Sequence, residues 1–288
     1  MSSQTSFIIS WIVYSSMLFF VSCTSKALDD EQLIVPSFIA DVSDTRMTKI
    51  IAHRGYWNTK GSAQNSITAI EKAFEIGADG IEFDIWATVD DTVIVCHDPE
   101  YAGLTISSSK YEDLIVTPLP NGERIPTFRE YLCKLKEFPN MILFIEMKDV
   151  ESSLLIPKII QETGIKNKIV YISFHRKACE NIIANNPRNH VELLKTGTSP
   201  LSPDYLASFG YRGMDYTVKL YRENSFLISD AIKIGFVLSV WIVNDVLDYE
   251  WAFSNGFRYV TTDRPDLLVD YTRNKPIYWE NNGLLWIN

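Results

Sequence analysis

The sequence predicts a (β/α)8 barrel, and two observations support that fold class. From Lys49 onward, short runs rich in β-branched residues alternate with amphipathic stretches about eight times, as expected of repeated βα units. The strand-like runs are almost continuously apolar, which is typical of parallel strands covered on both faces. No G-x-G-x-x-G or Walker loop follows any of these runs, so a nucleotide-binding doubly wound sheet is disfavoured.

Each apolar run predicts one strand, and we expect strands at 49–53, 80–86, 141–147, 168–174, 190–195, 213–217, 236–242 and 257–262. The amphipathic stretches between them predict helices at 66–77, 127–138, 152–163, 176–185, 203–209, 226–234 and 245–254. One further strand is expected at 92–96, after a turn at Asp90-Asp91. The connection 99–126 is long for a compact domain, so we expect an insertion over the barrel mouth.

Residues 1–22 resemble a secretory signal peptide. The stretch 7–22 is uncharged and mostly apolar, shorter than the about 20 residues of a membrane-spanning helix but suited to a signal-peptide core. Val21-Ser22-Cys23 resembles a lipobox, so we expect Cys23 to become an acylated N-terminus and 23–46 to form a flexible tether. Because no lysine or arginine precedes the apolar stretch, a short uncleaved membrane anchor remains the alternative.

These features predict an exported protein, lipid-anchored to a bacterial membrane on its periplasmic or surface side, with a barrel domain at 47–270 and a C-terminal tail at 271–288. The formal net charge is −9, and none of the charged residues lies in 1–22. An acidic chain without a basic run argues against nucleic acid as a partner. The other cysteines, Cys96, Cys133 and Cys179, show neither zinc-ligand spacing nor a disulfide framework.

Acidic side chains gather at the expected C-terminal ends of strands, where (β/α)8 barrels build their active sites. Glu82 and Asp84 share one face of the second strand, and Glu146 and Lys148 share one face of the third. If these faces point inward, three carboxylates converge, which is costly unless a cation lies between them. Carboxylate oxygens favour a hard ion, so the sequence predicts a Mg²⁺ or Ca²⁺ site.

Two histidines at strand ends, His53 and His97, have the chemistry of a general acid and base, although His97-Asp98 could alternatively be a strand-end capping pair. Arg54 can grip phosphate oxygens in a bidentate manner, and Lys148 adds a point charge. His175 follows the fourth strand and is placed either for substrate contact or to cap the next helix. Acid–base residues, cations and a metal site together indicate phosphodiester hydrolysis.

Two longer segments, IIAHRG at 50–55 and GADGIEFDIWATVDDTVIVCHD at 77–98, resemble the glycerophosphodiester phosphodiesterase family. The resemblance covers residues 49 to about 268, with weaker support from ERIPTFREYL at 123–132, LFIEMK at 143–148, SVWIVN at 239–244 and VTTDRPD at 260–266. It implies a (β/α)8 barrel with a small insertion after the second histidine. By this resemblance, His53 and His97 are the catalytic pair and Arg54 binds the phosphate. The implied metal ligands are Glu82, Asp84 and Glu146, with Lys148 beside them, and Trp241 resembles the family's aromatic wall against the leaving alcohol.

The chain departs from the family pattern P-E-N-[ST], because Ala63-Gln64-Asn65-Ser66 replaces a carboxylate by an amide. Gln64 and Asn65 remain candidates for substrate binding, since an amide can coordinate or donate a hydrogen bond. We expect metal-dependent hydrolysis of glycerophosphodiesters to glycerol 3-phosphate and an alcohol. The alternatives are the same chemistry on lysophospholipids or phosphorylated glycans, or a weakly active surface lipoprotein that binds phosphodiesters. A glycosidase is disfavoured because it explains neither Arg54 nor the two histidines.

Overall fold

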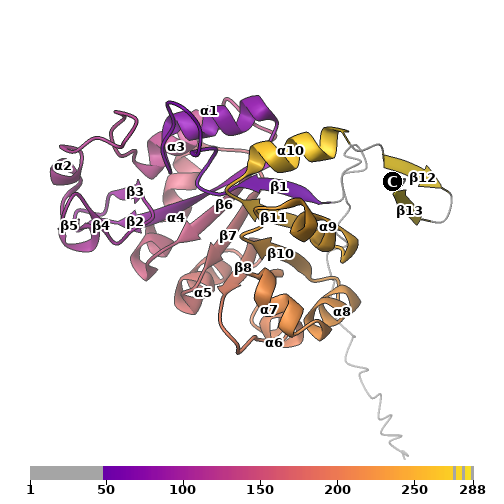
Figure 1. Ribbon diagram of the computed structural model, residues 1–288. Helices are drawn as coiled ribbons and strands as arrows, with labels where there is room; N and C mark the ends of the chain where they lie inside the picture. Colours follow the sequence, from indigo (N-terminus) through magenta and orange to yellow (C-terminus); the bar gives the residue numbers. More distant parts are fainter. Residues whose placement is uncertain (1–47, 275–276, 281–282, 287–288) are drawn as a thin grey trace, which may run out of the picture. The chain divides into compact units, whose positions relative to one another are not determined.

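The computed structural model describes residues 48–274 and the backbone of 277–280 and 283–286 (Figure 1). Its parallel strands close into a barrel in the order β1-β2-β6-β7-β8-β9-β10-β11, since β1 pairs with both β2 and β11. The strands are β1 Lys49–Ala52, β2 Gly80–Ala87, β6 Ile142–Met147, β7 Ile169–Ser173, β8 His190–Lys195, β9 Gly213–Thr217, β10 Val237–Trp241 and β11 Tyr259–Thr262. The expected (β/α)8 barrel is confirmed.

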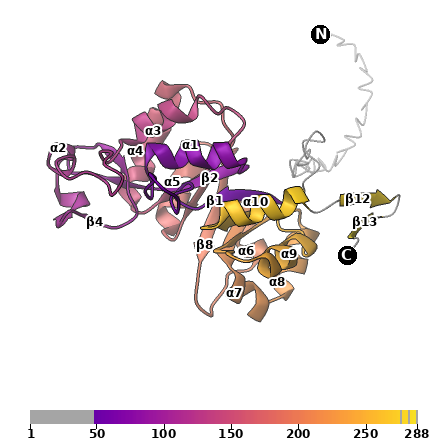
Figure 2. The ribbon, with the colours of Figure 1, turned by 45° about the horizontal axis from the view of Figure 1, so that its top comes forward.

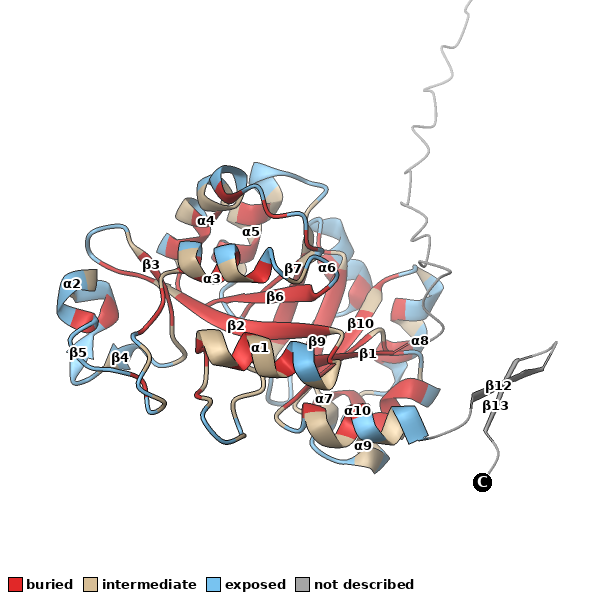
Figure 3. Cartoon of the chain, turned by 90° about the horizontal axis from the view of Figure 1, so that it is seen from above, coloured by how far each residue is buried: buried red, intermediate tan, exposed pale blue. Residues whose placement is uncertain are grey.

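Helices cover the outside of the barrel, so the strands are mostly buried while the outer helix faces are exposed (Figure 3). They are α1 Ile67–Ile76, α3 Phe128–Leu135, α4 Val150–Thr163, α5 Arg176–Asn185, α6 Pro203–Ser208, α7 Val218–Glu223, α8 Phe226–Lys233, α9 Val246–Ser254 and α10 Pro265–Asn274. The helices α7 and α10 were not predicted from the sequence. A six-residue helix such as α7 is too short to show a clear helical period.

The C-terminal helix α10 lies against α1 and β1 (Figure 2). Pro265 stands at its start, where a missing backbone N–H costs nothing, and the helix continues to Asn274. The expected boundary at residue 270 therefore falls inside α10, and the barrel's last helix includes the first residues assigned to the tail. Further on, β12 Ile277–Glu280 and β13 Gly283–Trp286 pair as an antiparallel hairpin.

An antiparallel strand, β3 Val93–Val95, extends the C-terminal half of β2, as expected. After it comes an insertion with a short hairpin, β4 Glu100–Tyr101 and β5 Leu104–Thr105, followed by a 3₁₀ helix at Ile106–Ser108 and the α-helix α2 Tyr111–Leu114. Figure 1 shows this insertion beyond the C-terminal end of β2. The insertion has a small apolar core of its own, made by Ile94, Ile106, Leu114 and Ile125.

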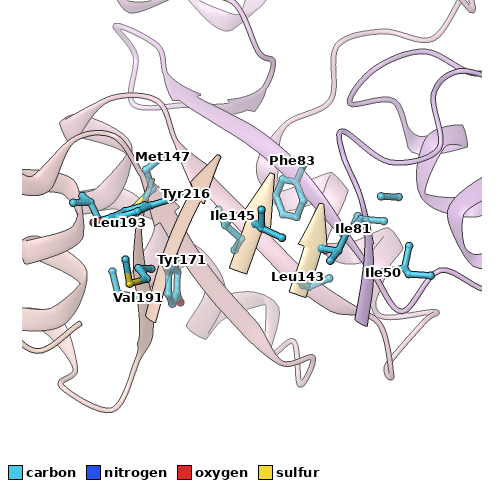
Figure 4. Packing of buried hydrophobic residues seen from close by; sticks show 14 of the residues in the cluster. Ile50, Ile81, Phe83, Leu143, Ile145, Met147, Tyr171, Val191, Leu193 and Tyr216 are labelled. Atoms are coloured by element: carbon cyan, nitrogen blue, oxygen red, sulfur yellow. The ribbon is translucent and has the colours of Figure 1, made fainter. Parts of the chain in front are cut away.

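Alternation along the strands divides the core into an outer and an inner layer. Outward side chains such as Phe83 and Ile145 pack under the helices (Figure 4). Inward side chains form a separate apolar cluster, in which the rings of Phe144 and Tyr259 meet edge to face at 5.0 Å. This cluster shares the barrel interior with buried polar side chains, among them Glu192 and Ser239, and its members Ile172 and Leu194 reach the level of the carboxylates.

The expected signal peptide at 1–22, the lipidation site Cys23 and the tether at 23–46 lie outside the described residues. Within the described part of the chain, no helix combines the length and apolar character needed to cross a bilayer. Among the described residues, Cys96, Cys133 and Cys179 are free thiols.

Candidate active site

Three buried carboxylates meet at the C-terminal end of the barrel. Glu82 and Asp84 point inward from β2, and the parallel register sets Asp84 directly beside Glu146 of β6. One oxygen of each side chain lies within 4.8 Å of the other two. The period-two expectation for these strands placed the three groups on one face, and the structure brings them together.

The three carboxylates fit a hard divalent cation. Glu82 Oε1 and Asp84 Oδ1 are buried and accept no hydrogen bond within the described residues. Burial, and then the charge of Asp84, raise the pKa of both Glu82 and Glu146. Since like charges in so small a space repel one another, a divalent ion would satisfy both the unpaired oxygens and the excess negative charge.

Lys148, at the end of β6, is the nearest cation to this cluster. Its Nζ lies 2.8 Å from Glu146 Oε1 and 3.4 Å from Asp84 Oδ1. Burial alone lowers the pKa of Lys148, but the charges of Asp84 and Glu146 outweigh it and raise the pKa. The side chain is therefore a charged ammonium at the edge of the carboxylate cluster.

Arg54 connects the loop after β1 to the carboxylates. Its backbone N–H donates to Glu82 Oε2 at 2.9 Å, and its guanidinium NH1 donates to Gln64 Oε1 at 2.6 Å. The following residue, Gly55, has φ +73°, and an added Cβ would lie 2.6 Å from the Cβ of Ala69. Glycine is required there because the loop packs directly on α1 and turns through the left-handed region.

His53 is held in a fixed orientation by an acidic partner. Its Nδ1 lies 2.8 Å from Asp263 Oδ1, which leaves Nε2 facing the site, 3.8 Å from Glu82 Oε2. Asn244 donates to Asp263 Oδ2 at 3.1 Å and accepts the Asp263 backbone N–H at 2.8 Å. Partial burial raises the pKa of Asp263, but the hydrogen bond and the charge of His53 lower it further, to about 2.

His97 follows β3 and has a similar arrangement. Its Nδ1 lies 2.7 Å from Asp98 Oδ1, and its backbone carbonyl accepts the indole N–H of Trp86 at 3.2 Å. Burial lowers the pKa of His97 by more than the charge of Asp84 raises it. The histidine thus pairs with Asp98 and also lines the cavity described next.

A cavity of about 150 Å³ opens at this end of the barrel. One part of its lining carries the expected chemistry: His53, Arg54, Glu82, His97, Glu146 and Lys148. The remainder is Ile172, Phe174, Leu194, Asp215, Trp241, Ile242 and Thr261. His97 also borders a larger groove, of about 740 Å³, between the loop 57–65 and the insertion.

The remaining predicted residues lie at different distances from this cavity. Trp241 lines it, and its indole N–H donates to the backbone oxygen of Asp215 at 3.0 Å. Gln64 and Asn65 line the larger groove, and Asn65 Nδ2 donates to Asp84 Oδ2 at 2.9 Å. His175 is exposed at the start of α5, lies in neither lining and makes no side-chain cap.

Three residues of the site were not predicted from the sequence. Phe174 lines the cavity in place of His175, and its ring meets that of Trp241 edge to face at 5.6 Å. Asp263 lies two residues after the inward-facing Thr261, within a motif already noted, so strand periodicity was an available signal. Asp215 is a single acidic residue in an apolar strand, and only the closed barrel shows that it reaches the cavity.

Comparison with known proteins defines the class to which this fold and site belong. The model of the glycerophosphoryl diester phosphodiesterase family matches residues 53–267. The chain belongs to that family and is an enzyme of that class.

Its relatives include a glycerophosphodiester phosphodiesterase of Caldanaerobacter subterraneus, 27% identical over 78% of this chain and 98% of the relative. A crystal structure of a glycerophosphodiester phosphodiesterase from Parabacteroides distasonis is 35% identical, covers 80% of this chain and 98% of its own, and has a TM-score of 0.75. An Oleispira antarctica phosphodiesterase in complex with the product sn-glycerol-3-phosphate shares the fold at a TM-score of 0.68, with 17% identity over 79% of this chain and 97% of its own.

Proposed function

We propose that the protein hydrolyses glycerophosphodiesters to glycerol 3-phosphate and an alcohol by metal-assisted acid–base catalysis. One observation carries the proposal: His53, His97, Arg54 and Lys148 line a single cavity together with buried carboxylates. This set supplies two proton-transfer groups, two cations for the phosphate and ligands for a metal. The product named for the Oleispira antarctica phosphodiesterase agrees with this reaction.

Glu82, Asp84 and Glu146 would hold the divalent ion, either Ca²⁺ or Mg²⁺. When bound, such an ion polarises the phosphoryl oxygens and neutralises charge that develops on them. Glu82 Oε1 and Asp84 Oδ1 support this assignment, because within the described residues these buried oxygens accept no hydrogen bond, which is costly. Asn65 holds Asp84 in place through the 2.9 Å hydrogen bond, and so acts on the ligand set.

Arg54 and Lys148 bind the nonbridging oxygens, the first as a planar donor and the second as a point charge. One histidine accepts a proton from the attacking water as its oxygen bonds to phosphorus. The other histidine donates a proton to the alkoxide as the bond between phosphorus and the alcohol oxygen breaks. Asp263 and Asp98 each hold an imidazole through Nδ1, so each Nε2 is available for proton transfer.

The larger groove favours lysophospholipids as a second candidate substrate. It adjoins the cavity at His97 and offers Trp57, Tyr101, Leu119 and Pro120 for contact with an extended apolar leaving group. A weakly active phosphodiester-binding protein is the third candidate, because Gln64 replaces a carboxylate and holds Arg54.

Turnover measurements on the purified protein separate these candidates. We expect release of glycerol 3-phosphate from glycerophosphocholine with Ca²⁺ or Mg²⁺, and its loss in excess EDTA. Faster turnover of lysophosphatidylcholine or of a phosphorylated glycan would favour one of the alternative substrates. Full activity in EDTA would contradict the metal assignment, and absence of turnover with every metal would favour the binding protein.

We also propose that the protein is exported and anchored by acylation of Cys23. The uncharged stretch 7–22 and the lipobox-like Val21-Ser22-Cys23 support this placement. Mass spectrometry of the protein extracted from membranes should find a diacylated or triacylated N-terminal Cys23. Cys23→Ala should retain its leader, whereas an intact Met1 in the unaltered protein would contradict the proposal.

A further inference from the structure

His97 lies just beyond the paired part of its strand, and its side-chain partner is exposed. The register pairs of β2 and β3 end at Ile85 and Val95, two residues before His97. The Asp98 side chain is 72% exposed, and within the described residues its carboxylate makes no hydrogen bond besides the one with His97. Exposed charged partners contribute little to the position of a side chain, so another contact has to hold His97.

His53 has firmer support. Its partner Asp263 is 24% exposed and is held by two hydrogen bonds with Asn244. Two imidazoles that share one cavity thus differ in what fixes their aspartates. The difference shows that the support of His97 has to come from its backbone rather than from Asp98.

The backbone around His97 is tied to β2 on both sides. Before it, the Cys96 N–H donates to the Asp84 carbonyl at 3.0 Å. After it, the His97 carbonyl accepts the indole N–H of Trp86 at 3.2 Å. Because the peptide groups are planar, restraining them on either side of a residue restrains the direction in which its side chain leaves the backbone.

Trp86 is well placed for this contact. It lies in β2, opposite Ile94 of β3 in the antiparallel register, and its ring packs against the apolar cluster that contains Ile94. Trp86 lines neither the cavity nor the larger groove. The indole therefore contacts His97 without touching a substrate bound in either space.

We propose that Trp86 is a positioning residue, whose indole N–H holds the backbone of His97 so that the imidazole keeps its place in the cavity. The inference rests on the proposed function, in which His97 transfers a proton, and it names the residue through which β2 places that group. Because β2 also carries Glu82 and Asp84, one strand sets the imidazole relative to the carboxylates. A proton-transfer group has to lie within hydrogen-bond reach, so a small displacement of His97 slows the reaction.

Trp86→Phe tests the contact, because it removes the indole N–H and keeps an aromatic ring. With glycerophosphocholine and Ca²⁺ or Mg²⁺, we expect kcat to fall by about 5-fold to 20-fold. KM should change by less than about 2-fold, since Trp86 does not line the spaces that bind the substrate. β-(3-Benzothienyl)alanine at position 86 has the shape of the indole with sulfur in place of N–H. It should give the same loss, and it serves if Trp86→Phe does not fold.

A double-mutant cycle with His97→Ala shows whether Trp86 acts through His97. In the His97→Ala protein, Trp86→Phe should lower kcat by less than about 2-fold, because no imidazole remains to be positioned. The same loss in both backgrounds would overturn the proposal, since it would indicate a general effect on the fold or on the carboxylate cluster.

Trp251→Phe is the matched control. Trp251, in α9, also packs against an aromatic ring, that of Phe257 at 5.1 Å between centroids, and it lines neither the cavity nor the groove. This variant should leave kcat and KM unchanged.

An unchanged kcat in both variants at position 86 would overturn the positioning role and leave the phosphodiesterase activity intact. If His97→Ala kept its kcat, or if the unaltered protein turned over neither glycerophosphodiesters nor lysophospholipids, the proposed function would fail, and the positioning role would fail with it.

Discussion

At the scale of single residues, each of the two histidines of the cavity is hydrogen-bonded to an aspartate. Each donates or accepts through Nδ1 to a neighbouring aspartate, His53 to Asp263 at 2.8 Å and His97 to Asp98 at 2.7 Å. Such a partner fixes the ring orientation and stabilises the imidazolium that forms when a proton arrives. The two pairs differ in sequence distance, since Asp98 is adjacent to its histidine and Asp263 is 210 positions away.

His53→Ala and His97→Ala should each lower kcat by roughly 100-fold or more, within the usual contribution of a general acid or base. The double variant should lose far less than the product of the two losses, because both groups act in one step. Steady-state kinetics on glycerophosphocholine measure this. His175→Ala, exposed and outside the cavity, is the matched control, and near-normal kcat in either active-site variant would make that histidine structural.

Asp263 also predicts a change in stability with pH. Its pKa is about 2 in the folded protein and about 3.9 in an unfolded chain, so folding favours the ionised carboxylate. The resulting stabilisation, roughly 1–2 kcal/mol, is present above about pH 4 and is lost as the pH falls toward 2. Urea unfolding of the unaltered protein and of Asp263→Asn should therefore differ most at pH 5–6. A difference that stays constant between pH 2 and 6 would contradict the assignment.

Gln64 shows how a residue can match a family position and still have a different contact. Its place in the motif suggested a role near the metal or the substrate. In the structure its oxygen accepts a hydrogen bond from the Arg54 guanidinium. The amide thus orients the Arg54 side chain without adding a charge to the carboxylate cluster.

At the scale of elements, the site depends on the pairing of β2 with β6. Their register sets Asp84 against Glu146 and Glu82 against Phe144, so two of the carboxylates lie in one layer and the third lies one step below. A shift of one residue would turn the carboxylates outward and bring Phe83 and Ile145 into the barrel. The buried apolar surface under the helices holds this register (Figure 4).

Removing one carboxylate should have opposite effects with and without metal. Glu82→Gln keeps an acceptor for the Arg54 N–H but removes a buried charge, so the metal-free protein should be more stable to heat than the unaltered one. Added Ca²⁺ or Mg²⁺ should raise the Tm of the unaltered protein and not that of the variant. Glu71→Gln, on α1 and outside the carboxylate cluster, is the control. Equal metal-induced shifts in both proteins would contradict the ligand assignment.

Much of this arrangement follows from local sequence patterns. The expected strands at 190–195 and 213–217 and the helix at 176–185 coincide with β8, β9 and α5. These elements have clear alternation or helical period and short connections. Two kinds of feature were missed: short elements such as α7, and partners joined only by barrel closure, such as His53 with Asp263. No local pattern encodes a contact between the first and last strands.

At the scale of the whole molecule, Gly80 sits where the barrel closes. It pairs with Ile51 of β1 and with Ile142 of β6, and an added Cβ would lie 2.3 Å from the Ile142 backbone oxygen. Gly80→Ala should therefore force strands apart and destabilise the fold by roughly 1–3 kcal/mol. Chemical denaturation measures the loss. An unchanged free energy of unfolding would show that the strands around Gly80 can accommodate a methyl group without moving apart.

The insertion leaves the barrel and returns to it at nearly the same point. Ile94 bridges Thr127, and the Val95 N–H donates to the Pro126 carbonyl at 2.9 Å, so both ends are clamped beside β2. Between them lies a segment with an apolar core of its own. An insertion with fixed ends suits protein engineering. Loops of other lengths can replace it after Asp98 without moving either histidine. Libraries of such replacement loops would change which substrates the larger groove accepts, while the barrel keeps the residues of the cavity in place.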